Sequence, residues 1–265
     1  MPDLLYSKII CFYMEKTKKV IIVSDVHGRT FWKNDVLLDG LDKDDTQIVF
    51  LGDYLDHYGF EGITIYDSLS NFYEIIDLRK NHSNVTLLLG NHDIHYYPPM
   101  YGDWGCRRYD DCLPQVSNLF VDYNDLFKIA HEVKGGEKTY LFTHAGVLDG
   151  WLKRSNGRKD MEGRNLDLSA ESLNTLSPLR DEDVNILWDV SEERGGNARY
   201  GSCVWADVCE HMYGDANKNK EVYQIFGHSL SYPTIYDPVI EDTFAMLDCR
   251  KIFVLDTESG LLEGV

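Results

Sequence analysis

Residues 20–28 read Val-Ile-Ile-Val-Ser-Asp-Val-His-Gly and carry the clearest indication of how this chain folds. Four aliphatic residues follow one another without polar alternation, which is typical of a strand buried on both faces. Two potential metal ligands, Asp25 and His27, come directly after this run. We therefore expect a buried strand at residues 20–23 that presents Asp25 and His27 at its carboxyl end.

The same arrangement recurs four more times along the chain. The further runs are 48–51 before Gly52-Asp53, 85–89 before Gly90-Asn91, 140–142 before Thr143-His144, and 222–226 before Gly227-His228. Between the second and third runs, Ile65, Leu69, Phe72 and Ile76 recur at the spacing of one helix face. This strand-helix-strand order predicts an α/β fold, in which polar residues gather at the carboxyl ends of the strands.

The rest of the chain predicts one domain with elaborate loops. Residues 244–247 and 252–255 are two short apolar runs joined by four residues, and we expect them to form a β-hairpin. The two long segments between the motifs show no clear strand rhythm. The organisation that we expect is an N-terminal extension at residues 1–13, then a single domain at 14–265 with insertions or caps at about 95–135 and 148–201.

The composition excludes several classes of function. The 265 residues include 26 Lys plus Arg against 44 Asp plus Glu, a formal charge of −18 that disfavours duplex nucleic acid and membrane surfaces as partners. No apolar run approaches the roughly 20 residues of a membrane span, and the start lacks the pattern of a signal peptide. The six cysteines do not have the spacing of a zinc site, so we interpret them as reduced thiols in a cytoplasmic protein.

Each polar residue at a strand end also has an ordinary structural interpretation. Asp53 fits a turn or a helix cap, Asn91 fits a turn, and His144 fits a hydrogen-bonded histidine of the core. Taken together, however, these residues would place carboxylate oxygens, an amide oxygen and imidazole nitrogens around one point. This mixed set of ligands is typical of a site for divalent transition metals.

The order and spacing of these motifs resembles the calcineurin-like metallophosphoesterase superfamily, in particular its serine/threonine phosphoprotein phosphatase branch and the bacterial relatives of that branch. The matching pieces are Ser24-Asp25-Val26-His27-Gly28, Gly52-Asp53-Tyr54-Leu55-Asp56, Gly90-Asn91-His92-Asp93, Thr143-His144-Ala145-Gly146 and Gly227-His228-Ser229. The resemblance implies a four-layered sandwich of two mixed β-sheets flanked by helices, with a dinuclear metal centre at the strand ends. It also implies that Asp25 and His27 hold the first metal, that Asp53 bridges both, and that Asn91, His144 and His228 hold the second.

The resemblance further implies hydrolysis of a phosphate ester by a hydroxide that bridges two divalent metal ions. Manganese is the expected metal, with iron, zinc, cobalt and nickel as alternatives, because a shell of oxygen and imidazole ligands accepts all of them. His92 cannot easily share a metal with its neighbour Asn91, so we interpret it as the general acid that protonates the leaving group, with Asp56 fixing its tautomer. An orienting role alone is the alternative for His92.

The departures from the family pattern concern the residues that bind phosphate. The eukaryotic phosphatases that the chain resembles carry an arginine at the position of His57, so one phosphate clamp is missing or replaced. Arg29, which follows Gly28, and Arg199 in the late insertion are the candidate substrate-binding residues, together with His57 itself. For each arginine, a solvated position on the surface is the alternative.

The leading prediction is a metal-dependent phosphoesterase that hydrolyses phosphomonoesters, similar to a serine/threonine protein phosphatase. One alternative is a hydrolase of dinucleoside polyphosphates or a phosphodiesterase, which is expected to have an adenine slot built from aromatic residues such as Tyr96, Tyr97, Trp104, Tyr109 or Trp151. The other alternative is a binding scaffold that has lost the chemistry. The presence of six expected ligands, His92 and Asp56 argues against the scaffold, because function depends on the site rather than on the fold.

Overall fold

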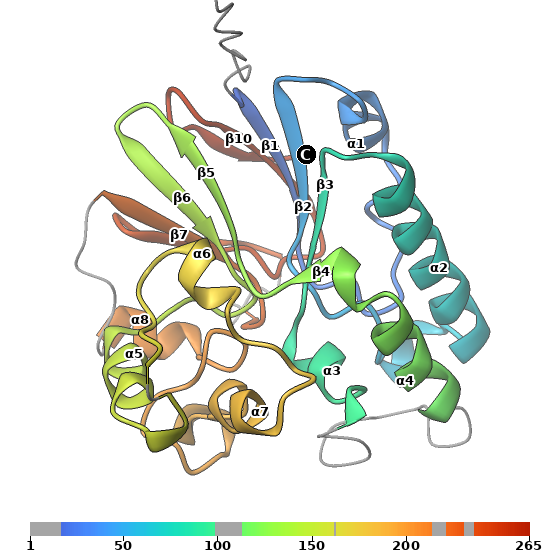
Figure 1. Ribbon diagram of the computed structural model, residues 1–265. Coiled ribbons are helices and arrows are strands. Elements are labelled where there is room, and N and C mark those ends of the chain that lie inside the picture. The colour runs from blue at the N-terminus through green and yellow to red at the C-terminus, as the bar shows by residue number, and fades with distance from the viewer. Residues whose placement is uncertain (1–16, 99–112, 162, 214–220, 231–235) are drawn as a thin grey trace, which may run out of the picture.

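The computed structural model describes residues 17–98, 113–161, 163–213, 221–230 and 236–265, which fold into two mixed β-sheets with helices around them (Figure 1). The expected extension at residues 1–13 lies outside the described residues. Among the described helices, none is both long enough and apolar enough to cross a bilayer. The α/β class and the two mixed sheets agree with the expectation from the sequence.

The first sheet has the strand order β11-β10-β1-β2-β3-β4. Its strands are β1 (Lys19–Val23), β2 (Thr46–Phe50), β3 (Val85–Leu88), β4 (Phe127–Lys128), β10 (Ile252–Asp256) and β11 (Leu262–Gly264). Strands β1 to β4 run parallel to their neighbours, whereas β10 pairs antiparallel with both β1 and β11. The carboxyl ends of β1, β2 and β3 therefore lie at one edge of this sheet.

The second sheet has the strand order β5-β6-β7-β9-β8. Its strands are β5 (His131–Gly135), β6 (Lys138–Phe142), β7 (Val222–Phe226), β8 (Val239–Ile240) and β9 (Phe244–Met246). Strands β6, β7 and β9 are parallel, and the antiparallel strands β5 and β8 close the two sides. All five strands expected before the polar motifs are thus present, three in the first sheet and two in the second.

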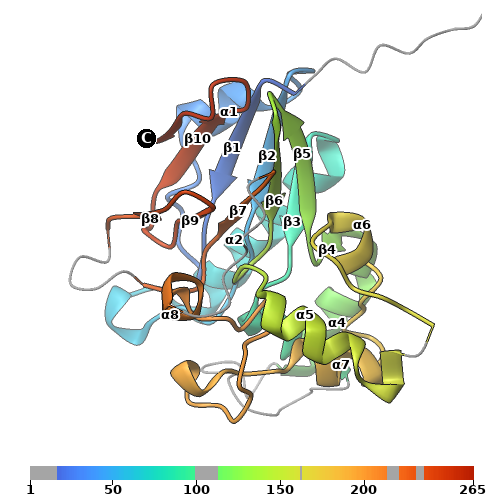
Figure 2. The ribbon, with the colours of Figure 1, turned by 90° about the vertical axis from the view of Figure 1, so that its left-hand side faces the viewer.

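The helices pack outside the sheets and beyond their ends (Figure 1, Figure 2). They are α1 (Asp35–Gly40), α2 (Ile65–Asn81), α3 (Asn91–Ile94), α4 (Leu113–Asp122), α5 (Asp149–Asn156), α6 (Ala170–Leu173), α7 (Asp181–Leu187) and α8 (Val208–Tyr213), with short 3-10 turns η1 (Gly59–Glu61), η4 (Asn124–Leu126), η5 (Lys159–Met161) and η6 (Glu192–Arg194). Helix α2 contains the predicted apolar face. It begins at a capping box in which the Thr64 hydroxyl accepts from the Asp67 amide and the Asp67 carboxylate accepts from the Thr64 amide.

The core is divided by the first sheet. Val20 and Ile22 of β1 face the second sheet and pack with residues such as Phe142 and Ile225, whereas Ile21 and Val23 face the helices and pack in the cluster that contains Phe72 of α2. Both faces of β1 are therefore buried. This is the physical reason that residues 20–23 carry no polar alternation.

One expectation about the strands was wrong, and two strands were missed. Residues 244–247 and 252–255 do not form a hairpin, because β9 joins the second sheet beside β7 while β10 joins the first sheet beside β1. The segment at 95–135 shows no clear strand rhythm in the sequence, but β4 and β5 lie in its second half and extend one sheet each. Both errors have one cause: strand partners distant in sequence decide these pairings, and local patterns do not report them.

Candidate metal centre

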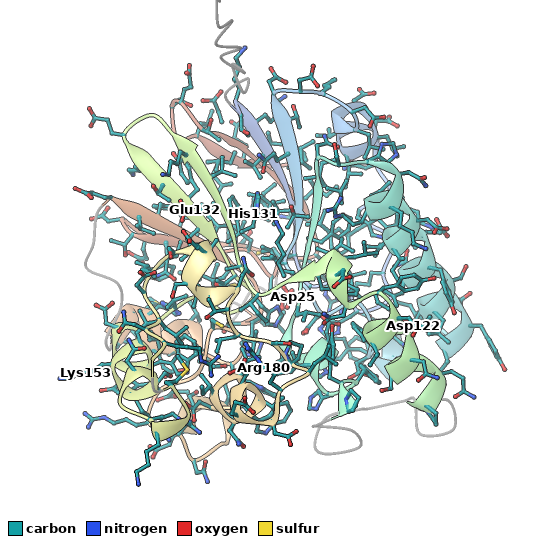
Figure 3. The ribbon with its side chains drawn as sticks, in the orientation of Figure 1. Asp25, Asp122, His131, Glu132, Lys153 and Arg180 are labelled. Carbon is teal, nitrogen blue, oxygen red and sulfur yellow. The ribbon has the colours of Figure 1, made fainter. Side chains whose placement is uncertain are left out.

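The five polar motifs meet where the strands of both sheets end. Figure 3 places Asp25 near the middle of the molecule, between the strands and the helices that follow α4. His27, Asp53, Asp56 and His228 all have positive φ values, of 44°, 54°, 59° and 69°. Non-glycine residues rarely adopt this conformation, and sharp turns of this kind aim side chains at a common point beyond the strand ends.

The first group of potential ligands consists of Asp25, His27 and Asp53, whose ligating atoms lie within 4.8 Å of one another. Nε2 of His27 lies 3.4 Å from a carboxylate oxygen of Asp53. Nδ1 of His27 donates to the carbonyl of Leu55 at 2.9 Å, which leaves Nε2 as the nitrogen with a lone pair. All three side chains are buried.

The second group consists of Asp53, His144 and His228, again with ligating atoms within 4.8 Å of one another. Nδ1 of His144 donates to the carbonyl of Leu51 at 2.8 Å, so its Nε2 carries the lone pair. That Nε2 lies 2.9 Å from Oδ1 of Asn91 and 3.5 Å from a carboxylate oxygen of Asp53. Nδ1 of His228 lies 2.9 Å from the same Asn91 oxygen. Asp53 belongs to both groups, as expected of a bridging ligand.

The electrostatics of the two groups favour divalent cations. Burial raises the pKa of Asp25 and of Asp53 well above the usual value, and neighbouring carboxyl groups raise both further. Burial lowers the pKa of His144 to about 3 and the pKa of His228 well below its usual value, so both imidazoles are neutral and able to coordinate. The imidazoles are thus in the neutral form that a metal requires, and the buried carboxyl groups are costly to ionise unless cations lie beside them.

The chemistry of the ligating nitrogen and oxygen atoms tests whether a metal ion fits between them. The lone pair of His144 Nε2 faces Oδ1 of Asn91 at 2.9 Å, an amide oxygen that has no hydrogen to donate, and lies 3.5 Å from an oxygen of Asp53. Acceptors that face one another in a buried site repel unless a cation lies between them. The residues therefore fit two metal ions, of which the first would be held by Asp25, His27 and Asp53, and the second by Asp53, Asn91, His144 and His228.

Two glycines allow the carboxylates to approach the strand ends. A Cβ atom on Gly90 would lie 2.1 Å from Oδ1 of Asp53, and one on Gly227 would lie 2.0 Å from Oδ2 of Asp25. Real contacts of this kind are essentially never so short, so a side chain at either position would displace a candidate metal ligand. This explains why glycine precedes both Asn91 and His228 in the sequence.

Asp93 holds the loop that carries Asp53. Its carboxylate accepts from three buried amides, those of Asp53 and Gly90 at 2.7 Å and that of Tyr54 at 3.0 Å. Burial raises the pKa of Asp93 to about 7, although the three amides act in the opposite direction. Asp93 therefore positions the loop that carries Asp53.

We expect Asp93→Ala to destabilise the protein by about 3 kcal/mol or more, because it leaves three buried amides without an acceptor, each at a cost of about 1–3 kcal/mol before water relieves it. Urea unfolding measures the change. Asp77→Ala is the matched control, since Asp77 is exposed on α2 with only a 3.9 Å ion pair to Lys80 and should change stability by less than about 0.5 kcal/mol. Equal stability of Asp93→Ala and the wild type would show that the three amides find other acceptors.

His92 lies at the edge of the two groups with a chain of hydrogen bonds behind it. Its Nδ1 is 2.8 Å from Oδ2 of Asp56, which is fully buried, and the hydroxyl of Tyr96 donates to the other oxygen of Asp56 at 2.6 Å. The backbone amide of His92 donates at 2.9 Å to Asp53, the residue that belongs to both groups. The side chain of His92 remains 17% exposed, which is enough for contact with a bound substrate. The sequence contained no sign of the contribution of Tyr96.

The three candidate substrate-binding residues differ in their surroundings. His57 is buried, with only 3% of its surface exposed. Arg29 is ion-paired with Glu61 at 3.1 Å and donates to the carbonyl of Asp25 at 3.3 Å. Arg199 is exposed and lies over the ring of Tyr200. The charge of a different arginine, Arg194, acts on His144 and His228 and lowers the pKa of both.

Three of the five aromatic residues named for the adenine slot of a nucleotide hydrolase are buried where the structure describes them. Tyr96, Tyr97 and Trp151 are fully buried in the core, and Trp104 and Tyr109 lie outside the described residues. A cavity of about 630 Å³ is lined instead by Trp188, Val190, Arg194, Gly195, Gly196, Asn197 and Trp205. The ring of Trp205 lies 5.8 Å from that of His228, so this cavity adjoins the metal centre.

Comparison with known proteins agrees with the geometry. The sequence pattern of the family described as calcineurin-like phosphoesterase matches residues 18–232, a range that includes every ligand from Asp25 to His228. A catalytic subunit of protein phosphatase 2A from Dictyostelium discoideum is 31% identical to this chain over 244 residues, which are 89% of this chain and 70% of that protein.

Proposed function

The chain belongs to the calcineurin-like phosphoesterase family and is a hydrolase of phosphate esters, and on this premise we propose that its substrates are phosphomonoesters, including phosphoserine and phosphothreonine in proteins. The main observation behind the proposal is that Asp53 belongs to both groups of potential metal ligands, so that the two groups meet at one buried site. The similarity to a protein phosphatase 2A catalytic subunit supports the protein-phosphatase branch.

Two divalent metals, when bound, lower the pKa of water to give a nucleophile near neutral pH and neutralise the oxygens of the phosphoryl group. We propose manganese, because oxygen and imidazole ligands in this ratio suit it. The protein holds the ligands in place before any substrate arrives. Hydrogen bonds from His27 and His144 to backbone carbonyls fix the orientation of both rings, and the amide of His228 donates to Asp25 at 2.9 Å.

His92 is proposed to give its proton to the leaving oxygen of the substrate. A general acid in this position must be protonated when the bond to phosphorus breaks, and a carboxylate behind the imidazole stabilises the protonated form. Asp56 provides this carboxylate, and Tyr96 holds Asp56 in place from the other side. The proton therefore leaves from Nε2 of His92 while Nδ1 remains hydrogen-bonded to Asp56.

We propose that the organic part of the substrate binds in the cavity beside the position of the second metal ion. Its two tryptophans offer apolar surface, and Arg194 offers a guanidinium that is ion-paired with Asp207 at 3.3 Å. A peptide side chain next to a phosphoserine fits such a surface. Two tryptophan rings also stack well on a nucleobase, so hydrolysis of dinucleoside polyphosphates is the second candidate function.

A substrate panel with the manganese-loaded protein tests the proposal. We expect hydrolysis of 4-nitrophenyl phosphate and of phosphoserine and phosphothreonine peptides, and a loss of about 10²-fold or more when a chelator removes the metals. Phosphodiesters and dinucleoside polyphosphates should react more slowly than the peptides. Faster hydrolysis of dinucleoside polyphosphates would overturn the protein-phosphatase assignment in favour of the second candidate.

A further inference from the structure

The connection between β9 and β10 brings two more charged residues to the edge of the sandwich that holds the metal ligands. Strand β9 is parallel to β7, with Phe226 opposite Met246. His228 lies two residues beyond Phe226, and Asp248 lies two residues beyond Met246, at the same end of the sheet. A sixth strand therefore ends in a polar motif, here Asp248-Cys249-Arg250, which the expectation of a hairpin had hidden.

Arg250 has the same unusual backbone as the residues of the metal centre. Its φ is +58°, and among the described residues six non-glycine residues have positive φ, four of which belong to the five motifs. An arginine has no side-chain hydrogen bond to its own turn that would favour this conformation. The surrounding structure must impose it, and backbone of this kind is concentrated at functional sites.

The side chain of Arg250 is joined to the metal centre by a chain of ion pairs. Nη1 of Arg250 forms an ion pair with Oε1 of Glu61 at 2.9 Å, and the same carboxylate accepts from Nε of Arg29 at 3.1 Å and lies 3.1 Å from its Nη2. Nη1 of Arg29 in turn donates to the backbone carbonyl of Asp25 at 3.3 Å. Glu61 thus orients two guanidinium groups, one of which contacts the backbone of a metal ligand.

Arg29 and Arg250 differ in whether the N–H groups of their side chains already have acceptors within the protein. Nε, Nη1 and Nη2 of Arg29 all contact protein acceptors, so Arg29 supports the arrangement. Nε of Arg250 is buried and has no hydrogen-bond partner within the described part of the chain, although the side chain as a whole is 18% exposed. The ion pair with Glu61 holds one nitrogen of the guanidinium, so the remaining N–H groups point in a fixed direction. This arrangement suits hydrogen bonding to an oxyanion.

The charges near Arg250 determine how strongly it would attract an anion. Glu61 and the buried carboxyl of Asp248 offset the two arginines, and burial raises the pKa of Asp248 to about 6 while the charges of Arg29, Arg250 and Arg194 lower it. The cluster is therefore close to neutral and would not attract anions at long range. The cluster would therefore bind an anion through directed hydrogen bonds at short range.

We propose that Arg250, oriented by Glu61 and supported by Arg29, binds a second anionic group of the substrate, adjacent to the phosphate that is hydrolysed. This inference rests on the proposed function. The hydrolysed phosphate lies at the metals, and Arg250 is separated from them by Glu61 and Arg29. The group that it reaches is therefore a neighbour in the same molecule, either a further phosphate or a carboxylate.

Inhibition of 4-nitrophenyl phosphate hydrolysis tests the proposal in the manganese-loaded protein at a fixed concentration of free manganese. One arm compares ADP with AMP, and the other compares a phosphoserine peptide that has an adjacent Asp with the same peptide carrying Ala. We expect the inhibitor with the second anion to bind about 10-fold or more tightly in at least one arm, as one charge-assisted hydrogen bond allows. The arm that shows the preference identifies the source of the anion.

Arg250→Gln should reduce this preference to less than twofold. Arg250→Lys should keep only part of it, because lysine retains the positive charge but lacks the planar guanidinium group with its several N–H donors. Lys251→Gln is the matched control, since it removes one exposed neighbouring charge and should keep the full preference. Melting temperatures confirm that each variant is folded. An undiminished preference in Arg250→Gln, or no preference in the wild type in either arm, overturns the assignment.

Failure of the proposed function gives a different result. In that case the wild type does not hydrolyse 4-nitrophenyl phosphate in a metal-dependent way, before any variant is made. Calorimetric titration of the wild type and Arg250→Gln with ADP and AMP then tests the anion subsite by itself. Equal affinities of the two proteins for ADP would overturn it.

Discussion

Asp53→Asn is expected to reduce kcat/KM for 4-nitrophenyl phosphate by about 10³-fold or more, which corresponds to about 4 kcal/mol of transition-state stabilisation. Asp53 is the only member of both ligand groups in the described part of the chain. An amide offers one neutral oxygen where the carboxylate offers two charged ones, so it cannot hold two cations together. Bound metal, measured by elemental analysis, should fall from two ions per chain to one or fewer.

The same substitution should leave the fold intact. The amide oxygen of the variant can still accept from the backbone of His92, which keeps the loop in place. In the metal-free protein, Asp53→Asn should even raise the melting temperature, because it removes one charge from a buried group of carboxyls that raise the pKa of one another. Added manganese should then stabilise the wild type and have much less effect on the variant.

Asp77→Asn is the control for these measurements, since Asp77 is exposed on α2 and distant in sequence from every motif. It should retain activity, metal content and response to manganese. A variant of Asp53 that still binds two metals and hydrolyses the substrate at the wild-type rate would contradict the bridging role.

The convergence of the candidate ligands could be predicted from the sequence because its signal is local. Each candidate ligand follows a largely buried strand within a few residues, and the last three residues of β1 and β2 and the last two of β3 are apolar because both faces of the sheet are covered there. The carboxyl ends of parallel strands then bring these residues together without further information. The turn at Gly227 is also local, since the close approach of Asp25 requires a residue without a side chain.

The positions of the long polar side chains could not be predicted in the same way. The direction of Arg29 depends on Glu61, a residue 32 positions away in a 3-10 turn that no pattern marks. Arg250 was hidden because β9 and β10 resemble a hairpin locally, and only the pairing of β10 with β1, more than 200 residues earlier, separates them. Contacts between distant segments decide the positions of both arginines. His57 is buried, which its position directly after the second motif did not indicate.

His92→Asn is expected to lower kcat by about 10² to 10⁴-fold with no loss of bound metal. The range corresponds to about 2.7 to 5.4 kcal/mol in the activation free energy. The asparagine keeps the backbone amide that donates to Asp53, so the bridging ligand is undisturbed. It cannot hold a proton for the leaving oxygen, and the part of the pH profile that depends on a protonated imidazole should disappear.

The leaving group decides between a general acid and a residue that only orients its neighbours. A 4-nitrophenolate ion leaves without a proton, whereas the alkoxide of a serine side chain needs one, so His92→Asn should impair a phosphoserine peptide far more than 4-nitrophenyl phosphate. His82→Asn is a matched control, because His82 forms the same 2.8 Å contact with Asp42 through Nδ1 at an exposed position. It should leave both rates unchanged. A loss in His92→Asn that is equal for good and poor leaving groups would assign His92 to positioning, since only proton transfer distinguishes the two substrates.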